Sequence, residues 1–115
     1  MTNVADSNPA DARPLAIRAL NDRFRRTFNG GRVVATAGIM ALDEAACLRL
    51  FKAFDKFDEG NDPWGEHDFG SIKAEGESIF FKIDYLALGG SLHSEDPADP
   101  ARTERVMTIM LASEY

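Results

Sequence analysis

The sequence predicts a single small domain of the α+β class, in which helices pack on a short, mainly antiparallel sheet. The chain has 115 residues, close to the commonest size of one domain. Apolar residues recur at three- and four-residue spacing in residues 14–29 and 43–57, which is typical of amphipathic helices. The β-rich segments 68–74 and 77–87 flank a Glu-Gly pair that favours a β-hairpin. The expected order of elements is α-β-α-β-β-α.

Residues 1–12 are mostly small and polar, and we expect them to form a disordered lead-in to one domain spanning residues 13–115. The first helix is expected from Pro14, which suits a first helical turn, to the glycines that follow Asn29. The residues expected on its apolar face are Ile17, Leu20, Phe24 and Phe28. Three arginines are expected to point away from that face: Arg18, Arg25 and Arg26.

The next two elements are a strand and a second helix. Residues 32–38 (RVVATAG) are short and rich in β-branched side chains, which indicates a strand. Asp43 is expected to cap the helix that follows, because an aspartate oxygen can accept from the free amides of a first turn. The apolar stripe of this helix comprises Leu42, Ala46, Leu50, Ala53, Phe54 and Phe57.

The hairpin and the C-terminal element complete the fold. Ile79, Phe81, Ile83 and Tyr85 alternate with more polar neighbours, the period of two of a half-buried strand. Asp99 and Pro100 predict the start of a last helix. Residues 106–112 are so apolar that a buried strand is the alternative, because periodicity does not distinguish the two in a short apolar run.

Charge and composition exclude several classes of protein. Residues 1–32 contain six arginines and three aspartates, a net charge of +3, so the remaining residues carry −9 of the total of −6. Such an acidic body disfavours direct nucleic-acid binding, which needs cations, although the arginines of the first helix leave that alternative open. No apolar run approaches the roughly 18 residues of a membrane span. Cys47, the single cysteine, has small apolar neighbours and predicts a buried hydrophobe. We expect a cytoplasmic protein without a cofactor.

Residues 55–68 form the chemically richest segment, and glycines and Asn-Asp-Pro predict a loop in its middle. Acidic side chains and the only tryptophan could contact a protein partner there: Asp58, Glu59, Asp62, Trp64, Glu66 and Asp68. A calcium-binding loop beginning at Asp55 would have Gly60 and Glu66 in place. The comparison fails because Phe57 and Glu59 occupy the third and fifth positions, where the other ligands belong.

An alternative interpretation is a small enzyme or metal-binding protein that uses the consecutive residues Glu66, His67 and Asp68. The weak candidates for further ligands are His67 itself, Asp84 and His93. Consecutive residues of an extended chain point to opposite sides, so Glu66 and Asp68 could share a site more easily than either could with His67. No paired-histidine motif occurs, and no catalytic residue is assigned.

Several motifs in order resemble the family of small bacterial proteins known as domain of unknown function 3768. They are LNDRFR (20–25), GEHDFG (65–70), FFKIDY (80–85), DPADPA (96–101) and TIMLASEY (108–115). The resemblance spans residues 20–115 and implies an uncharacterised protein of proteobacteria, often carried on plasmids and other mobile elements. The resemblance implies no activity, and no catalytic residues are assigned in that family.

Two hypotheses about function follow. The first is a protein-binding module, an inhibitor of a nucleic-acid-handling or defence protein of the anti-CRISPR or anti-restriction type, with DNA mimicry as one route. Residues 55–68 alone are too dilute a mimic, since their five net charges lie roughly 9 Å apart, against about 3.4 Å for phosphates along one DNA strand. The second is the metal-dependent alternative. A homodimer is compatible with the sequence, and no membrane partner is expected.

Overall fold

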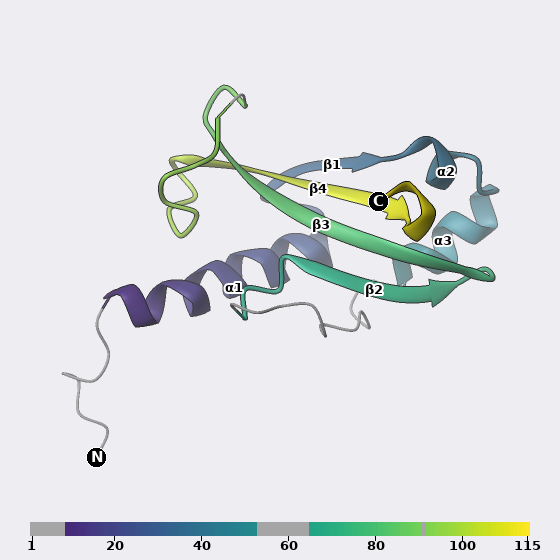
Figure 1. Cartoon of the computed structure of the whole chain (residues 1–115), viewed down its shortest axis with the longest axis horizontal. Helices are drawn as coiled ribbons and strands as arrows, with labels where there is room; N and C mark the ends of the chain where they lie inside the picture. The colour runs from purple at the N-terminus through teal and green to yellow at the C-terminus, as the bar shows by residue number, and fades with distance from the viewer. Residues whose placement is uncertain (1–8, 53–64, 91) are drawn as a thin grey trace, which may run out of the picture.

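The computed structural model describes residues 9–52, 65–90 and 92–115. Within them the chain forms helices, strands and a final 3₁₀ turn, which follow one another along the chain as shown in Figure 1. The elements are α1 (Pro9–Thr27), β1 (Gly31–Ala35), α2 (Ala37–Met40), α3 (Glu44–Lys52), β2 (Phe69–Ala74), β3 (Glu77–Ala87), β4 (Thr103–Leu111) and η3 (Ala112–Glu114).

The four strands form one mixed sheet in the order β1-β4-β3-β2. β3 pairs antiparallel with both β2 and β4, whereas β1 runs parallel to β4 along the opposite edge. The register places Val33, Met107 and Ile83 side by side across three strands. A mainly antiparallel sheet in an α+β domain is therefore confirmed.

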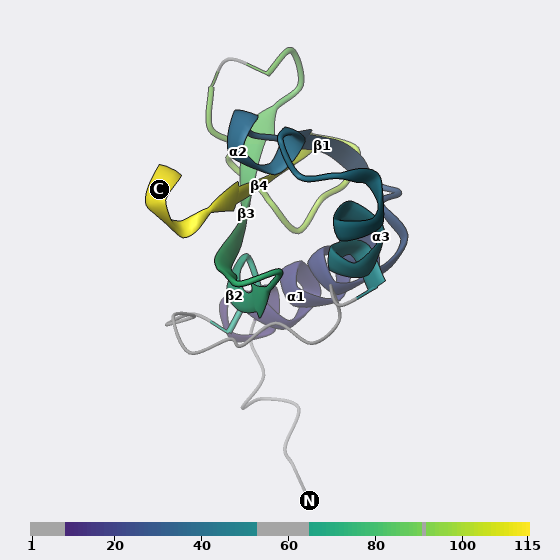
Figure 2. The ribbon, with the colours of Figure 1, turned by 90° about the vertical axis from the view of Figure 1, so that its right-hand side faces the viewer.

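One face of the sheet is covered by α1 and α3, and the hydrophobic core lies between them (Figure 2). The expected alternation of β3 is confirmed, because Ile79, Phe81, Ile83 and Tyr85 are all buried while Asp84 is exposed. The other principal core side chains are Ile17 and Phe24 of α1, Leu50 of α3, and Met107 and Ile109 of β4. Burial of these apolar side chains is the main source of stability in a domain of this size.

The C-terminal turn η3 lies on the other side of the sheet (Figure 2). Tyr115 packs edge-on against Phe69 and Phe80, with ring centroids 5.6 Å away in both cases. The side chain of Glu114 accepts hydrogen bonds from Thr36 Oγ1 at 2.6 Å and from the Gly38 amide at 3.0 Å. These contacts fasten the end of the chain to the sheet and to the first turn of α2.

The turn between β2 and β3 agrees with the hairpin predicted from the sequence. Glu75 and Gly76 both adopt left-handed backbone conformations, with φ of 57° and 76°. Two consecutive positive φ values define the type I′ turn, whose twist matches that of the flanking strands. The hairpin fixes the register that buries Ile79 and Phe81.

The predicted C-terminal helix is wrong, and the strand alternative is correct. Residues 103–111 form β4, which lies between β1 and β3 and is buried on both faces for most of its length. A strand buried on both faces has a nearly continuous apolar sequence, which removes the alternation that would have identified it. Asp99 caps a turn instead of a helix, because its carboxylate accepts from the Ala101 amide at 2.9 Å.

Two expectations for the first helix are also wrong. α1 begins at Pro9, so residues 9–12 of the expected lead-in are helical, and residues 1–8 lie outside the described part of the chain. The alanines at 10 and 12 favour the helix by their intrinsic propensity. Arg25 is only 3% exposed and lies over the Phe81 ring, whereas the prediction placed it on the solvent face. Its long side chain lets it reach the core side of the sheet from the edge of the apolar stripe.

The predicted strand 32–38 is found as β1 and ends earlier, at Ala35, where the short helix α2 follows. The cap of α3 is confirmed, since Asp43 Oδ1 accepts from the Ala46 amide at 2.7 Å. Cys47 is half-buried, and its sulfur lies 3.8 Å from the Ile39 carbonyl oxygen. Ala53, Phe54 and Phe57 of the expected apolar stripe lie outside the described residues.

Candidate functional site

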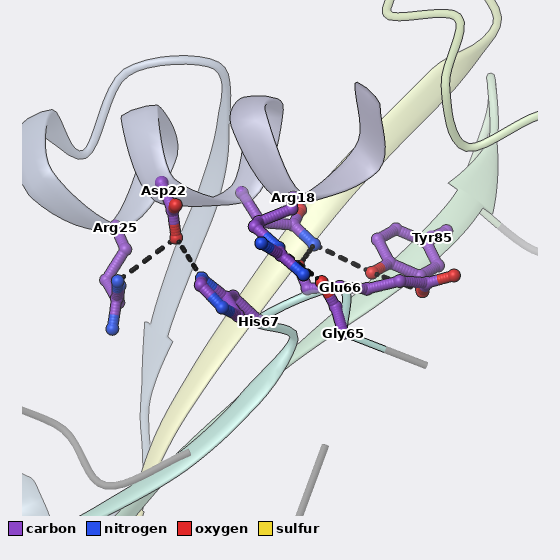
Figure 3. A network of polar contacts seen from close by, with 8 residues as sticks. Arg18, Asp22, Arg25, Gly65, Glu66, His67 and Tyr85 are labelled. Atoms are coloured by element: carbon purple, nitrogen blue, oxygen red, sulfur yellow. Dashed lines mark hydrogen bonds and ion pairs between the residues drawn. The ribbon is translucent and has the colours of Figure 1, made fainter. Parts of the chain in front are cut away.

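Among the described residues, an extensive group of polar contacts lies between α1, the segment 65–68 and β3 (Figure 3). We call it the polar network. Its members are Arg18, Asn21, Asp22, Arg25, Gly65, Glu66, His67, Asp68, Tyr85 and Arg105. Seven of them are labelled in Figure 3.

One side of the polar network joins three residues of α1 to three consecutive residues before β2. Arg18 Nε donates to the Gly65 carbonyl at 2.6 Å, and Asn21 Nδ2 donates to the Glu66 carbonyl at 3.0 Å. The Asp22 carboxylate lies 2.8 Å from His67 Nδ1. Positions three and four apart lie on the same side of a helix, so α1 presents these groups as one row. The row holds the segment that leads into β2.

The centre of the polar network is the hydroxyl of Tyr85. It accepts a hydrogen bond from Asn21 Nδ2 at 2.7 Å and lies 3.1 Å from Glu66 Oε1 and 3.2 Å from Asp68 Oδ2. Its single proton is shared between the two carboxylates. Burial raises the pKa of Tyr85, and the charges of Asp68 and Glu66 raise it further against the opposing effect of the Asn21 hydrogen bond. The phenol therefore stays protonated at neutral pH and acts as a donor.

Arg105 of β4 closes the polar network from the core side. Its Nε donates to Asn21 Oδ1 at 2.8 Å, which fixes the orientation of the amide so that Nδ2 faces Tyr85. The guanidinium also donates to the Pro97 carbonyl and lies 5.2 Å from the Tyr85 ring centroid. Asn21 is fully buried, and both ends of its amide are hydrogen-bonded, as a buried amide requires.

The structure brings together some of the candidate metal-binding residues and separates others. Glu66 and Asp68 share Tyr85, whereas His67 turns away to Asp22, in agreement with the expectation that His67 does not share a site with its two neighbours. His67 adopts a positive φ of 57°, which helps to turn its side chain toward α1. The idea that Asp84 approaches this cluster is wrong. Asp84 neighbours Tyr85 on the strand and therefore points to the opposite face, where it pairs with Lys82 at 3.4 Å.

The His93 ring lies edge-on to the Tyr85 ring, with centroids 6.3 Å apart, and His93 is exposed to solvent. Within residues 9–52, 65–90 and 92–115, no group of three or more His, Cys, Asp or Glu side chains is placed to hold a metal ion. The polar contacts of Glu66, His67 and Asp68 described above instead attach the segment 65–68 to α1 and β3.

The residues expected to bind a partner are only partly described. Asp58, Glu59, Asp62 and Trp64 lie outside the described residues. Glu66 and Asp68 are half-buried and contact Tyr85, so they are partly withdrawn from the surface that the sequence analysis assigned to them.

A surface that sequence reasoning missed lies at the connection between β3 and β4. Leu88 is 68% exposed and Leu92 is 72% exposed, and both line an open cavity of about 320 Å³. The rest of its lining comprises Ala87, His93, Ser94, Glu95 and Arg102. We call Leu88, Leu92 and His93 the apolar tip. The signal in the sequence was a pair of leucines on either side of a Gly-Gly turn, a place where polar residues are usual.

The apolar tip stands on a well-anchored base. The Ala87 amide donates to the Leu92 carbonyl at 2.6 Å, and His93 forms a bridge with Leu86 that continues the β3 pairing. Below it, the buried hydroxyls of Ser94 and Thr103 lie 2.7 Å apart. Backbone bonds of this kind hold the two leucines next to each other.

Sequence reasoning also missed Asn21 and Arg105 as buried polar residues. Asn21 lies four residues after Ile17 and three before Phe24, within the apolar stripe of α1. Arg105 interrupts the apolar residues of β4 at a position that faces the core. A polar residue at an apolar position is the signal that identifies such groups, because it must find a hydrogen-bond partner there.

Comparison with known proteins agrees with the resemblance seen in the sequence. No described helix is both long and apolar enough to cross a membrane. No curated protein and no solved structure matches the chain. The model of one protein family, described as protein of unknown function DUF3768, matches residues 35–114, which include every strand from β2 to β4. The chain therefore belongs to the DUF3768 family.

Proposed function

We propose that this chain is a small protein-binding module whose partner is a DNA-handling protein, and that the apolar tip is the anchor of the interface. The observation that carries the proposal is the exposure of two neighbouring leucines on an anchored turn. In this proposal the module inhibits its partner by occupying a basic surface.

The exposed apolar surface of the apolar tip supports the proposal, because a partner could bury it. Single exposed apolar side chains are common on soluble proteins, but Leu88 and Leu92 line one cavity together. Full burial of a leucine side chain contributes about 1.5–3 kcal/mol, and most of that remains available at exposures of 68% and 72%. The Ala87 amide donates to the Leu92 carbonyl, and the Gly90 amide donates to the Ala87 carbonyl. Because these bonds already hold the backbone beside the two leucines, little conformational entropy is lost there when a partner covers them.

The charge of the chain supports a basic partner. Residues 33–115 carry a net charge of −9, and Glu95 beside the apolar tip is 89% exposed. Proteins that bind DNA present lysine and arginine to the phosphates, so their binding surfaces complement an acidic body. Complementary charge would steer the encounter, and the leucines would then supply short-range affinity.

The test begins with affinity capture from a proteobacterial lysate by the full chain and by a Leu88→Ser/Leu92→Ser variant. Any protein retained by the wild type alone is then purified, and its Kd is measured by calorimetry at two salt concentrations. We expect a DNA-binding protein whose Kd rises at least tenfold in the variant and also rises with salt, because both apolar contact and charge contribute.

Leu48→Ser is the matched control. Leu48 is 54% exposed on α3, so the substitution removes an exposed leucine away from the apolar tip and should leave Kd unchanged. Equal binding by the wild type and the Leu88→Ser/Leu92→Ser variant would contradict the role of the apolar tip. A partner without affinity for DNA would contradict the proposed partner class.

A further inference from the structure

Arg105 is a buried cation without a carboxylate partner among the described residues. It is 2% exposed, and its hydrogen bonds go to the neutral oxygens of Asn21 and Pro97. No ion pair joins it to a described carboxylate. Burial lowers the pKa of Arg105, and the electrostatic effects of Tyr85 and Glu66 oppose this change, so the guanidinium stays protonated at neutral pH. A buried charge of this kind is costly unless an anion compensates it.

A cavity of about 200 Å³ adjoins Arg105. Its lining comes from four parts of the chain: α1, the turn before β1, the loop before β4, and β4 itself. The lining residues are Leu20, Arg23, Asn29, Gly30, Pro100 and Arg105. The volume is below the roughly 300–1,000 Å³ of pockets for drug-sized ligands, so the cavity suits a small ion or the polar end of a small molecule.

Arg23 places a second guanidinium on the same cavity. It is exposed and forms no ion pair with any described residue. The carboxylates nearest in sequence are engaged elsewhere. Asp22 contacts His67 and Arg25, Asp99 accepts from the Ala101 amide, and Glu104 pairs with Arg32 at 3.8 Å. Two cations without carboxylate partners therefore line one small cavity.

We propose that this cavity is a binding site for a small oxyanion, phosphate or carboxylate, held between Arg23 and Arg105. Guanidinium groups suit both anions, because their paired N–H donors match the spacing of phosphate and carboxylate oxygens. Leu20 and Pro100 would contact any apolar part of the ligand. The site is separate from the apolar tip, so it does not depend on the proposed protein partner.

The test is an NMR titration of the full chain with inorganic phosphate and, separately, with acetate at a constant ionic strength of about 0.15 M. We expect saturable shifts of the Gly30 amide and of the Arg105 Nε–H signal. Saturation by phosphate assigns a tetrahedral anion, and saturation by acetate assigns a carboxylate; either result supports the site. The absence of saturable shifts with both anions up to about 20 mM, well above a millimolar Kd, would overturn it.

Arg23→Gln provides the decisive variant, because Arg23 is exposed and its loss leaves the core intact. We expect Kd to rise roughly tenfold to a hundredfold, the usual effect of losing a hydrogen bond to a charged group. Arg26→Gln is the control, since Arg26 is exposed on the same helix, carries the same charge and does not line the cavity. Equal weakening in both variants would show general charge attraction and would overturn the site.

Arg105→Gln tests the buried cation directly and should abolish binding. Because Arg105 also orients Asn21, the folding of this variant is checked by circular dichroism. If it does not fold, the comparison of Arg23→Gln with Arg26→Gln decides the question. A folded Arg105→Gln variant that binds phosphate or acetate with the Kd of the wild type would also overturn the proposal.

Discussion

At the scale of single residues, the Tyr85 hydroxyl is the group on which the polar network depends most. It links Asn21 of α1 to Glu66 and Asp68, and Arg105 holds Asn21 in the orientation that this requires. When a buried polar group loses its hydrogen-bond partner, the folded protein is destabilised by more than the net stabilisation that the hydrogen bond had contributed. Removal of the Tyr85 hydroxyl oxygen should therefore change the hydrogen bonding of Asn21, Glu66 and Asp68.

We expect Tyr85→Phe to lower the free energy of unfolding by about 1–3 kcal/mol, because the buried Asn21 amide loses one of its two acceptors and the carboxylates of Glu66 and Asp68 lose a shared donor. Urea unfolding followed by circular dichroism measures the change. The control is Tyr115→Phe, since Tyr115 is 73% exposed and the substitution should change stability by less than about 0.5 kcal/mol. Equal stability of the two variants would show that the Tyr85 hydroxyl does not hold the polar network.

Residues also show where sequence reasoning succeeds. The sequence predicts different directions for the side chains of Glu66 and His67, and the structure agrees. The cause is not the alternation of an extended chain, because His67 has a left-handed backbone conformation with φ of 57°. The direction of Arg25 did not follow from helical periodicity, because a long side chain at the border of an apolar stripe can turn either way. The direction of the Arg25 side chain depends on its contacts with Asp22 and with the Phe81 ring, which form only in the folded protein.

At the scale of elements, the C-terminal turn η3 is tied to α2 by one carboxylate. Glu114 accepts from Thr36, from the Gly38 amide and from the Leu111 amide. The hydrogen bonds from Thr36, Leu111 and Gly38 lower the pKa of Glu114 below its ordinary value of 4.5. The hydrogen bonds that connect Glu114 of η3 to Thr36 and to Gly38 of α2 should therefore depend on pH.

A carboxyl whose pKa is lower in the folded protein contributes stability that is present above the unfolded pKa and is lost as pH falls through the folded pKa. We expect the Gly38 amide shift to be constant near neutral pH and to titrate with a midpoint below 4.5. NMR of the wild type and of Glu114→Gln measures this, and the variant should show no such titration. Glu77→Gln, at an exposed position of β3, should leave the midpoint unchanged. A midpoint at or above 4.5 in the wild type would contradict the tie.

Elements differ in how well the sequence predicts them. The β2–β3 hairpin was predictable because a Glu-Gly turn and an alternating strand are local signals. β4 was not, because its pairing with β1 and β3 joins residues about 75 and 25 positions away in the chain. Burial on both faces is a consequence of that pairing, and it erases the alternation on which a sequence-based assignment depends.

At the scale of the whole molecule, basic and acidic side chains occupy different parts of the sequence, but the fold packs these parts against each other. The +3 of residues 1–32 is concentrated in α1, which packs beneath an acidic sheet domain. Arg18 and Arg25 turn toward the polar network and the core, which leaves fewer cations of this helix on the surface. The protein should therefore present no continuous basic surface within the described residues.

We expect a labelled DNA duplex of about 20 base pairs to bind with a Kd weaker than about 10⁻⁴ M at 0.15 M salt, because non-specific binding requires several phosphate contacts. Fluorescence anisotropy measures it, with a basic DNA-binding protein as the positive control. Saturable binding at micromolar concentration, with a strong salt dependence, would contradict this expectation and would make α1 a nucleic-acid surface.

The sequence by itself determined the fold class, the family, the amphipathic faces of the helices and the hairpin, because each depends on residues close together in the chain. The tertiary structure decided that residues 103–111 form the central strand, that Asn21, Tyr85 and Arg105 meet, and that Arg23 and Arg105 line one cavity. These features join residues that are far apart in the chain. Their energies depend on burial and on partner geometry, and both quantities exist only after the helices and strands have packed together.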